Sequence, residues 1–143
     1  MCDLSKIRRL DLHDLKLEYD KVLEQLGALF TNLKEQETIL RERYYSGNSP
    51  TFVWVEQGII VGTCTLYILD KLQFRNPYAI LDDVAVVPEW RSKGIARQLI
   101  KYAIMYAHTR GVFKVILDCD PTLCKYYEQF GFYVNGACMR MDF

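Results

Sequence analysis

The apolar and polar positions in the first third of the chain predict a short strand followed by two helices. Residues 6–10 have the composition of a short strand. Between residues 11 and 30, apolar side chains recur every three or four positions, which is the spacing of one helix face. Residues 34–45 form a second helical candidate, and the serine, glycine, asparagine and proline of residues 46–50 end it.

The middle of the chain is strand-rich. Residues 51–55 and 59–68 are dominated by β-branched and aromatic side chains, which favour strands. The residues between them, Glu56-Gln57-Gly58, predict a hairpin turn. Residues 78–87 form a further strand candidate, and Pro88 ends it.

Helix and strand alternate in the last third. After a glycine-containing loop, one helix face carries Ile95, Leu99, Tyr102, Ala103 and Tyr106. Gly111 caps this helix, residues 112–117 predict a strand, Asp120-Pro121 begins a short helix, and residues 133–141 predict a last strand. This order of elements predicts an α/β (α+β) fold with a mixed, mostly antiparallel central sheet flanked by helices.

Composition and charge narrow the functional classes. The 143 residues include 18 basic and 18 acidic side chains, and this balance argues against a protein built to hold nucleic acid. No linker or repeat divides the chain, so residues 1–143 predict a single domain. Neither a signal core nor an apolar run of roughly 20 residues is present, and the five cysteines lack zinc-ligand spacing. We expect a soluble cytoplasmic protein with free thiols, no metal and no membrane partner.

Residues 81–96 carry the most specific chemical signal, because they predict a strand, a turn and the start of a helix. Backbone N–H groups at a helix N-terminus are unpaired, and the helix dipole adds positive potential there. Gly94 and Ala96 are small enough for the backbone to approach phosphate oxygens. Three basic side chains add charge, namely Arg91, Lys93 and Arg97. The stretch is a candidate pyrophosphate site, although spacing alone fits a plain turn with a solvated basic face equally well.

Two motifs resemble signatures of the GNAT acetyltransferases. Arg91-x-x-Gly94-x-Ala96 is similar to the acetyl-CoA motif of that family, (Q/R)-x-x-G-x-(G/A). Tyr126-Tyr127, followed by Gly131-Phe132, is similar to the family's (F/Y)-Y-x-x-x-G-F element. The motifs occur in the family's order, with a helix and a strand between them. The resemblance implies the GNAT fold and direct transfer of acetyl from acetyl-CoA to an amine.

The resemblance also implies how acetyl-CoA is held. In the family, the strand before the phosphate loop separates from its neighbour, which frees backbone N–H groups for pantetheine and the thioester carbonyl. A fully paired buried strand is the alternative. The expected cofactor-binding residues are Val84, Ala85, Val86, Arg91, Ser92, Lys93, Gly94, Ile95, Ala96 and Arg97.

Catalytic roles are implied for two side chains. Tyr127 is expected to protonate the leaving sulfur or to donate a hydrogen bond to it, and packing in the core is the competing role for either Tyr126 or Tyr127. Asp118, through its carboxylate or its backbone carbonyl, is the candidate acceptor for the amine proton. Asp82 and Asp83 are adjacent on a strand, so we expect their side chains on opposite faces.

Within the family, residues 81–133 most resemble glucosamine-6-phosphate N-acetyltransferases. The acidic pair, Phe113-Lys114 and residues 117–120 carry this match. It implies acetylation of glucosamine 6-phosphate, a step in UDP-N-acetylglucosamine biosynthesis. It also implies a homodimer with shared active sites, in which Lys114 of one chain serves the site of the other. The expected substrate-binding residues are Asp82, Asp83, Lys114 and Asp118.

Several positions depart from the family pattern. Asp142 stands where the sugar-phosphate enzymes tend to have an arginine for the phosphate, and Gly27 falls near a position where they offer a threonine. Leu123 replaces an asparagine that touches the cofactor in many relatives. Two alternatives therefore stay open. One is a GNAT enzyme that acetylates another amine, such as a protein N-terminus or a polyamine, and the other is a non-catalytic CoA-binding module.

Overall fold

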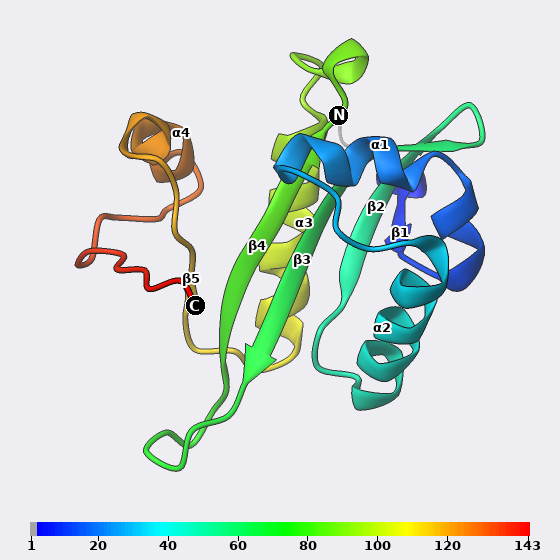
Figure 1. Cartoon of the computed structure of the whole chain (residues 1–143). Coiled ribbons are helices and arrows are strands. Elements are labelled where there is room, and N and C mark those ends of the chain that lie inside the picture. Colours follow the sequence, from blue (N-terminus) through cyan, green and yellow to red (C-terminus); the bar gives the residue numbers. More distant parts are fainter. Residues whose placement is uncertain (1–2) are drawn as a thin grey trace.

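Five strands form one mixed sheet in the computed structural model, which describes residues 3–143 except for the side chains of residues 44–46 (Figure 1). Their order is β1 (Ile7–Arg9), β2 (Thr51–Glu56), β3 (Ile59–Leu69), β4 (Tyr78–Val86) and β5 (Val115–Ile116). The first four strands are antiparallel to their neighbours, and β4 and β5 are parallel. The expected mixed, mostly antiparallel sheet with flanking helices is confirmed.

The longer helices cover the two faces of this sheet, with α1 and α2 on one side and α3 on the other (Figure 1). The α-helices are α1 (Tyr19–Leu23), α2 (Leu33–Ser46), α3 (Ile95–Thr109) and α4 (Cys124–Glu128). Short 3-10 turns are η1 (Leu4–Lys6), η2 (Leu12–Lys16), η3 (Glu24–Leu26), η4 (Pro88–Trp90) and η5 (Pro121–Leu123). The helix expected over residues 11–30 is broken into η2, α1 and η3. Glu18 interrupts it with a left-handed backbone, at φ 61°.

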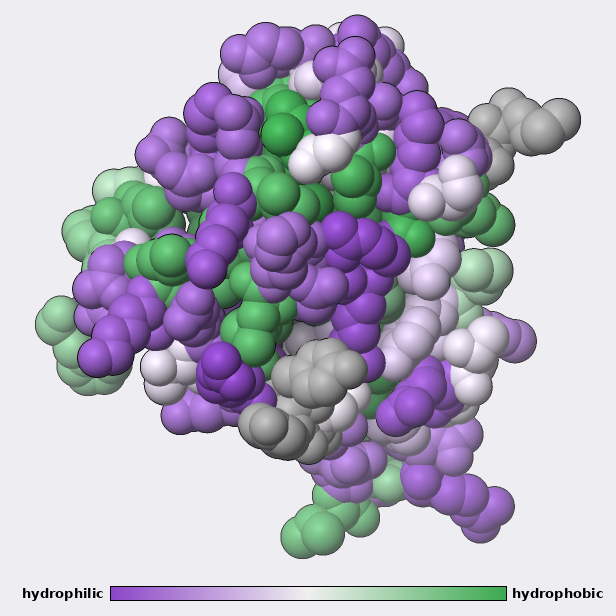
Figure 2. Space-filling model, turned by 90° about the vertical axis from the view of Figure 1, so that its right-hand side faces the viewer, coloured by the Kyte–Doolittle hydropathy of each residue, from purple (hydrophilic) through white to green (hydrophobic). Residues whose placement is uncertain are grey.

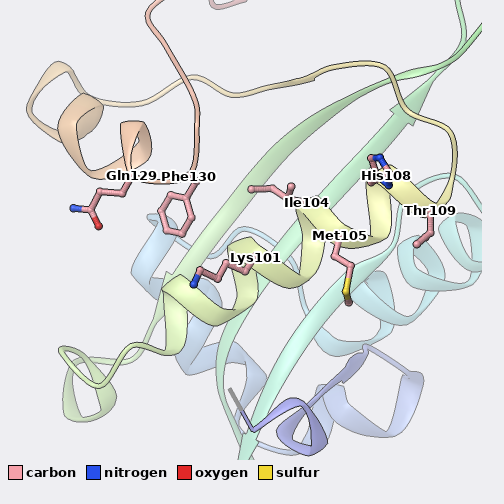
Figure 3. A pocket seen from close by; sticks show the side chains of 7 residues that line it. All are labelled: Lys101, Ile104, Met105, His108, Thr109, Gln129 and Phe130. Atoms are coloured by element: carbon pink, nitrogen blue, oxygen red, sulfur yellow. The ribbon is translucent and has the colours of Figure 1, made fainter. Parts of the chain in front are cut away.

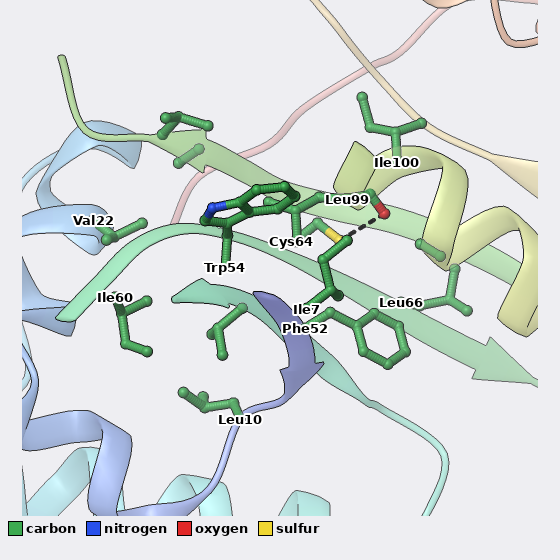
Figure 4. Close-up of a cluster of buried hydrophobic side chains, with 14 of the residues drawn as sticks. Ile7, Leu10, Val22, Phe52, Trp54, Ile60, Cys64, Leu66, Leu99 and Ile100 are labelled. Carbon is green, nitrogen blue, oxygen red and sulfur yellow. Dashed lines mark hydrogen bonds between the residues drawn. The ribbon is translucent and has the colours of Figure 1, made fainter. Parts of the chain in front are cut away.

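The face of the sheet toward α3 is apolar. Side chains alternate along a strand, so one set of residues on β3 and β2 faces this helix. The Cys64 thiol donates to the Leu99 carbonyl of α3 at 3.6 Å, and the Phe52 ring packs edge-on against Tyr102, with 5.0 Å between ring centroids. Figure 4 shows this core, in which Leu66 and Ile100 are fully buried.

The face toward α1 and α2 carries a layer of buried threonines. The Tyr19 hydroxyl of α1 lies 3.2 Å from Thr63 Oγ1, and Thr51 and Thr65 pair across β2 and β3 with 2.9 Å between their hydroxyls. Burial raises the pKa of Tyr19 to about 12, so its hydroxyl stays protonated. Tertiary hydrogen bonds therefore satisfy these buried polar groups, and α1 is fixed over the sheet.

The outer surface seen from the α2 side is mainly hydrophilic. In Figure 2, charged and polar side chains dominate that face, and apolar side chains appear in small groups between them. Within residues 3–143, every helix is too short or too polar to cross a lipid bilayer.

Two expected strands differ from the structure. The strand expected at residues 112–117 is only two residues long, and the strand expected at residues 133–141 does not form. The C-terminal segment is exposed instead, with 80% of Tyr133 and 92% of Met139 accessible to solvent. A strand is stable only when a neighbour completes its hydrogen bonds, and no strand among residues 3–143 pairs with this segment.

Gly62 on β3 sets how closely α3 approaches the sheet. A Cβ atom at this position would lie 3.0 Å from Ile95 Cγ2 and 3.2 Å from Leu99 Cδ1. Ile95 is the first residue of α3. A side chain at Gly62 would therefore displace the start of this helix.

We expect Gly62→Val to lower the free energy of unfolding by about 1–3 kcal/mol, the usual range for an overpacked core. Urea denaturation measures this change. Gly62→Ala adds less bulk and should fall between wild type and Gly62→Val. Equal stability of all three proteins would contradict the close packing of α3 on β3.

Candidate active site

The backbones of β4 and β5 pair over only two residues. Ala79 pairs with Val115 and Ile80 with Ile116. From there to Val86, β4 is paired only with β3. Among residues 3–143, no strand pairs with this edge of β4 beyond Ile80. The sheet is therefore open on the side where the resemblance predicts that pantetheine lies.

The other edge of β4 contains a bulge. Thr65 pairs with Asp82 but Thr63 pairs with Ala85, so two steps on β3 correspond to three on β4. Asp83 has a left-handed backbone, at φ 53°, and its N–H donates to the carboxylate of Asp82 at 2.8 Å. A bulge of this kind bends the strand and redirects its side chains.

The bulge changes the expectation that the two acids point to opposite faces. Asp82 pairs with Thr65, whose hydroxyl lies on the face toward α1 and α2. Asp83 lies on the same side, since Arg43 of α2 and the Thr65 hydroxyl both act to lower the pKa of its carboxyl. Strict alternation fails here because the extra residue of the bulge interrupts it.

The loop between β4 and α3 has the backbone of an anion site. Ser92 and Gly94 both have positive φ, at 60° and 80°. Gly94 is the N-cap of the 15-residue helix α3, and no side chain caps the N–H groups of its first turn. A Cβ atom at Gly94 would meet nothing within 4 Å, so the space beside the loop is open. Free N–H groups and the helix dipole suit a pyrophosphate, so the loop fits acetyl-CoA.

The basic side chains around this loop are held in different ways. Arg91 donates from Nε to the Val86 carbonyl at 2.9 Å and from Nη2 to Gln25 at 2.8 Å. Arg97 donates to Gln129 at 2.9 Å. Lys93 lies 4.5 Å from the centre of the Trp90 ring. Arg91 thus ties the loop to β4 and η3, and all three cations surround the N-terminus of α3. The glutamine partners, Gln25 and Gln129, could not be predicted from the sequence.

Tyr126 and Tyr127 lie side by side on α4, with their ring centroids 5.3 Å apart, and both are half-buried. Their surroundings differ. Burial raises the pKa of Tyr127, and Tyr126, Cys119, Cys64 and Asp82 raise it further. Burial also raises the pKa of Tyr126, but Arg97 of α3 opposes this. The Tyr127 hydroxyl is therefore within electrostatic reach of Asp82, and it stays protonated and able to donate at neutral pH.

Asp118 lies in the exposed loop after β5. Its Oδ2 accepts a hydrogen bond from the Cys138 thiol at 3.1 Å. The structure therefore places this carboxylate beside the C-terminal segment, and no hydrogen bond joins it to Tyr127 or to the acidic pair within residues 3–143. Asp118 remains a predicted proton acceptor.

Lys114 lies beside the N-terminal end of β4. Its carbonyl accepts from Ala79 N at 2.9 Å, and its ammonium is 5.3 Å from the Phe74 ring centre and 5.6 Å from that of Tyr78. Asp82 is three residues further along β4, roughly 10 Å away at about 3.3 Å per residue. Within one chain, Lys114 and the acidic pair are thus well separated.

A hollow of about 510 Å³ lies between the outer face of α3 and the end of α4 (Figure 3). It is lined by Lys101, Ile104, Met105, His108, Thr109, Gln129 and Phe130. The hollow does not include Tyr127 or the acidic pair, so it lies apart from the predicted catalytic and substrate-binding residues. The hydrogen bond from Arg97 to Gln129 connects its rim to the phosphate loop. Its five lining residues on α3 gave no signal in the sequence, because they are interspersed with core positions of that helix.

A model of the acetyltransferase (GNAT) family matches residues 14–132. The chain belongs to this family. Probable glucosamine 6-phosphate N-acetyltransferase 2 of Oryza sativa subsp. japonica is 35% identical over 145 residues, which cover 96% of this chain and 87% of that protein. A glucosamine 6-phosphate N-acetyltransferase of Trypanosoma brucei brucei is 34% identical over 87 residues, 59% of this chain and 58% of that protein.

Solved structures support the same assignment. The crystal structure of glucosamine-6-phosphate N-acetyltransferase from Arabidopsis thaliana matches with a TM-score of 0.90 and 26% identity, and the match covers 96% of this chain and 97% of that chain. This GNAT protein is accordingly an acetyl-CoA-dependent N-acetyltransferase. Within residues 3–143, no cluster of three or more histidine, cysteine, aspartate or glutamate side chains has the geometry of a metal site.

Gly94→Glu should weaken acetyl-CoA binding to this GNAT enzyme by at least tenfold, because it places bulk and negative charge beside the phosphate loop. A charge-assisted contact is worth about 1.5–3 kcal/mol, which corresponds to roughly ten- to more than a hundredfold in affinity. Isothermal titration calorimetry measures the dissociation constant.

Gly111→Glu is the matched control. Gly111 follows the other end of α3, also has a positive φ, at 73°, and also has no atom within 4 Å of a built Cβ. It therefore carries the same backbone strain without approaching the loop. Equal losses of affinity in both variants would show that strain, and not the loop, controls binding.

Proposed function

We propose that this enzyme transfers acetyl from acetyl-CoA to the amine of glucosamine 6-phosphate. The observation that carries the proposal is the bulge in β4, which sets Asp82 and Asp83 at the level where the other edge of this strand is open, with Asp82 in electrostatic reach of Tyr127. Relatives named for this reaction match nearly the whole chain, which supports the choice of acceptor. An acetyl-CoA consumption assay with amino sugars, their phosphates, polyamines and peptides tests it.

Each part of the site has a role in the proposed reaction. The neutral amine attacks the thioester carbon, the C–N bond forms and the C–S bond breaks. Backbone N–H groups of residues 84–86 stabilise the charge on the carbonyl oxygen, at about 2.7–4 kcal/mol for one such donor. Tyr127 gives a proton to the departing thiolate, and Asp118, through its carboxylate or carbonyl, takes the proton that the amine loses.

The acidic pair suits an amino sugar as acceptor. Burial and the charge of Asp82 raise the pKa of Asp83, while Arg43 and Thr65 oppose the rise. The ionised carboxylates would accept hydrogen bonds from sugar hydroxyls and hold the incoming ammonium before it loses its proton. This arrangement requires both acids on the sheet face toward α1 and α2, which is the acceptor side in this proposal. The bulge in β4 provides it.

Tyr127→Phe should lower kcat by roughly 10²–10⁴-fold, the usual contribution of general acid catalysis, with little change in the KM for acetyl-CoA. The hydroxyl acts mainly as the thiolate leaves, so its loss falls on the transition state. Tyr126→Phe is the matched control and should lower kcat much less. If single-turnover rates of Tyr127→Phe equalled those of wild type, Tyr127 would not be the acid.

We also propose a cytoplasmic homodimer with shared active sites. The C-terminal segment exposes apolar side chains such as Tyr133, Met139 and Met141, and Phe113 and Ile116 are exposed before and on the short edge strand β5. A second copy would cover both surfaces. Lys114 is distant from the acidic pair of its own chain, so it would reach the phosphate at the site of the partner chain. The four described cysteines are free thiols, which suits a reducing compartment.

Mixed dimers test the shared site. Lys114→Ala should weaken the binding of glucosamine 6-phosphate and leave the binding of acetyl-CoA unchanged. When Lys114→Ala and Tyr127→Phe chains are refolded together and the mixed dimers purified by two different tags, one site in each has both residues intact. We expect activity near half that of wild type. Activity at the level of the two parents would refute the shared site.

A second candidate function is acetylation of an amine without a phosphate. Asp142 favours it, because this acid replaces the expected arginine and its carboxylate accepts from Arg140 Nε at 2.7 Å. This acid adds no cation for a phosphate, and it neutralises the charge of the neighbouring Arg140. A higher kcat/KM for a polyamine or a peptide than for glucosamine 6-phosphate in the same assay would decide for this function.

A further inference from the structure

Arg43 of α2 lies over the threonine layer on the acceptor side of the sheet. Its Nη1 donates to Thr51 Oγ1 and its Nη2 to the Tyr67 hydroxyl, both at 3.3 Å. The guanidinium carbon is also 5.5 Å from the centre of the Tyr67 ring. Contacts with two strands therefore fix this cation on the sheet, although it comes from a helix 40 residues before the acidic pair.

The threonine layer connects Arg43 to the bulge in β4. Thr51 pairs with Thr65 at 2.9 Å between hydroxyls, and Thr65 pairs across the sheet with Asp82. Asp83, in its left-handed conformation, follows directly on the same face. Half-buried Tyr67 lies one strand position beyond Thr65 on this face, opposite Ile80. Arg43, Tyr67 and Asp83 thus surround one patch of the acceptor side.

Charged and titratable groups reach Asp83 from each element packed around it. Asp82 lies beside it on β4, Tyr67 and Cys64 belong to β3, Tyr19 to α1 and Arg43 to α2. Burial and the neighbouring Asp82 disfavour its ionised form, and the charge of Arg43 favours it. Tyr19, Tyr67 and Cys64 all have raised pKa values, so they remain neutral near pH 7. Arg43 is the cation that acts on this carboxylate from the facing helix.

We propose that Arg43 is a positioning residue of the acceptor site, which acts through Asp83 by keeping that carboxylate ionised for the incoming amine. The inference rests on the proposed role of Asp83 in binding the acceptor. Arg43 itself does not touch the reacting atoms, because Thr51 and Tyr67 occupy its guanidinium. Its effect on turnover is therefore electrostatic.

Removing the positive charge should raise the pKa of Asp83. A protonated Asp83 no longer attracts an ammonium, so the loss of activity should be greatest at low pH and smaller at high pH. The substrate amine titrates identically with every variant and cancels when the kcat/KM of a variant is divided by that of wild type. The pH dependence of this ratio therefore reports the enzyme alone.

The experiment measures kcat/KM for glucosamine 6-phosphate from pH 5 to 9 for three variants. With Arg43→Gln, we expect the ratio to wild type to fall to about one tenth on the acid side, the effect of a pKa shift of roughly one unit, and to rise toward one at high pH. Arg43→Lys keeps the charge and should show a much flatter ratio. Arg41→Gln, an exposed arginine on the same helix, is the control and should match wild type.

A double-mutant cycle completes the test. If Arg43 acts through Asp83, adding Arg43→Gln to Asp83→Asn should cost little more than Asp83→Asn alone. Equal losses in both backgrounds, or a ratio that is low at every pH, would show a merely structural role and overturn the inference. Urea denaturation of each variant identifies loss of fold.

The same data separate the inference from the proposed function. If Asp83→Asn impairs turnover and Arg43→Gln does not, only the proposed role of Arg43 is refuted. If Asp83→Asn leaves kcat/KM unchanged, the acceptor role of Asp83 falls, and the inference falls with it.

Discussion

The structure depends on how the two edges of β4 are satisfied. On one side, pairing with β5 ends at Ile80, and on the other a bulge at Asp83 shifts the register with β3. Backbone N–H and C=O groups inside a protein need partners, so an edge of β4 that faces no strand is a place for a ligand. The bulge and the opening occur at the same level of the strand. Cofactor and acceptor can therefore approach one peptide segment from different directions.

The helices on the two faces of the sheet are held by different interactions. The α3 face is apolar and tightly packed, with Gly62 allowing the helix to approach, and this packing fixes the helix N-terminus on which the phosphate loop depends. The α1 and α2 face is held by hydrogen bonds between threonines, Tyr19 and Arg43. Such bonds orient polar groups more sharply than apolar contacts do. That face is suited to hold the acids that receive a polar acceptor.

Local features of the sequence predicted much of this fold, and features that depend on distant partners escaped prediction. The strands β2, β3 and β4 and the loop at Gly94 follow from periodicity and glycine chemistry. The bulge at Asp83 does not, because register is set by pairing with another strand. The absence of a strand at residues 133–141 has the same cause, because strand formation there also depends on pairing with another segment. Arg43 gave no signal because only the folded sheet brings it to Tyr67.

The charges of the site bear on which acceptor fits it. A phosphorylated amino sugar carries a cation and an anion at opposite ends, so its site needs acids and bases held apart. Asp82 and Asp83 supply the acids on β4. Lys114 lies beside the N-terminal end of that strand, against the Phe74 and Tyr78 rings. The only arginine fixed near the acids, among the described residues, is bound to Thr51 and Tyr67 and balances Asp83. In the proposed site, a single chain supplies acids for the amine but leaves its own Lys114 far from them. A second copy that brought its Lys114 to the first would supply the cation for the phosphate, so the proposed acceptor and the proposed dimer are one question in this enzyme.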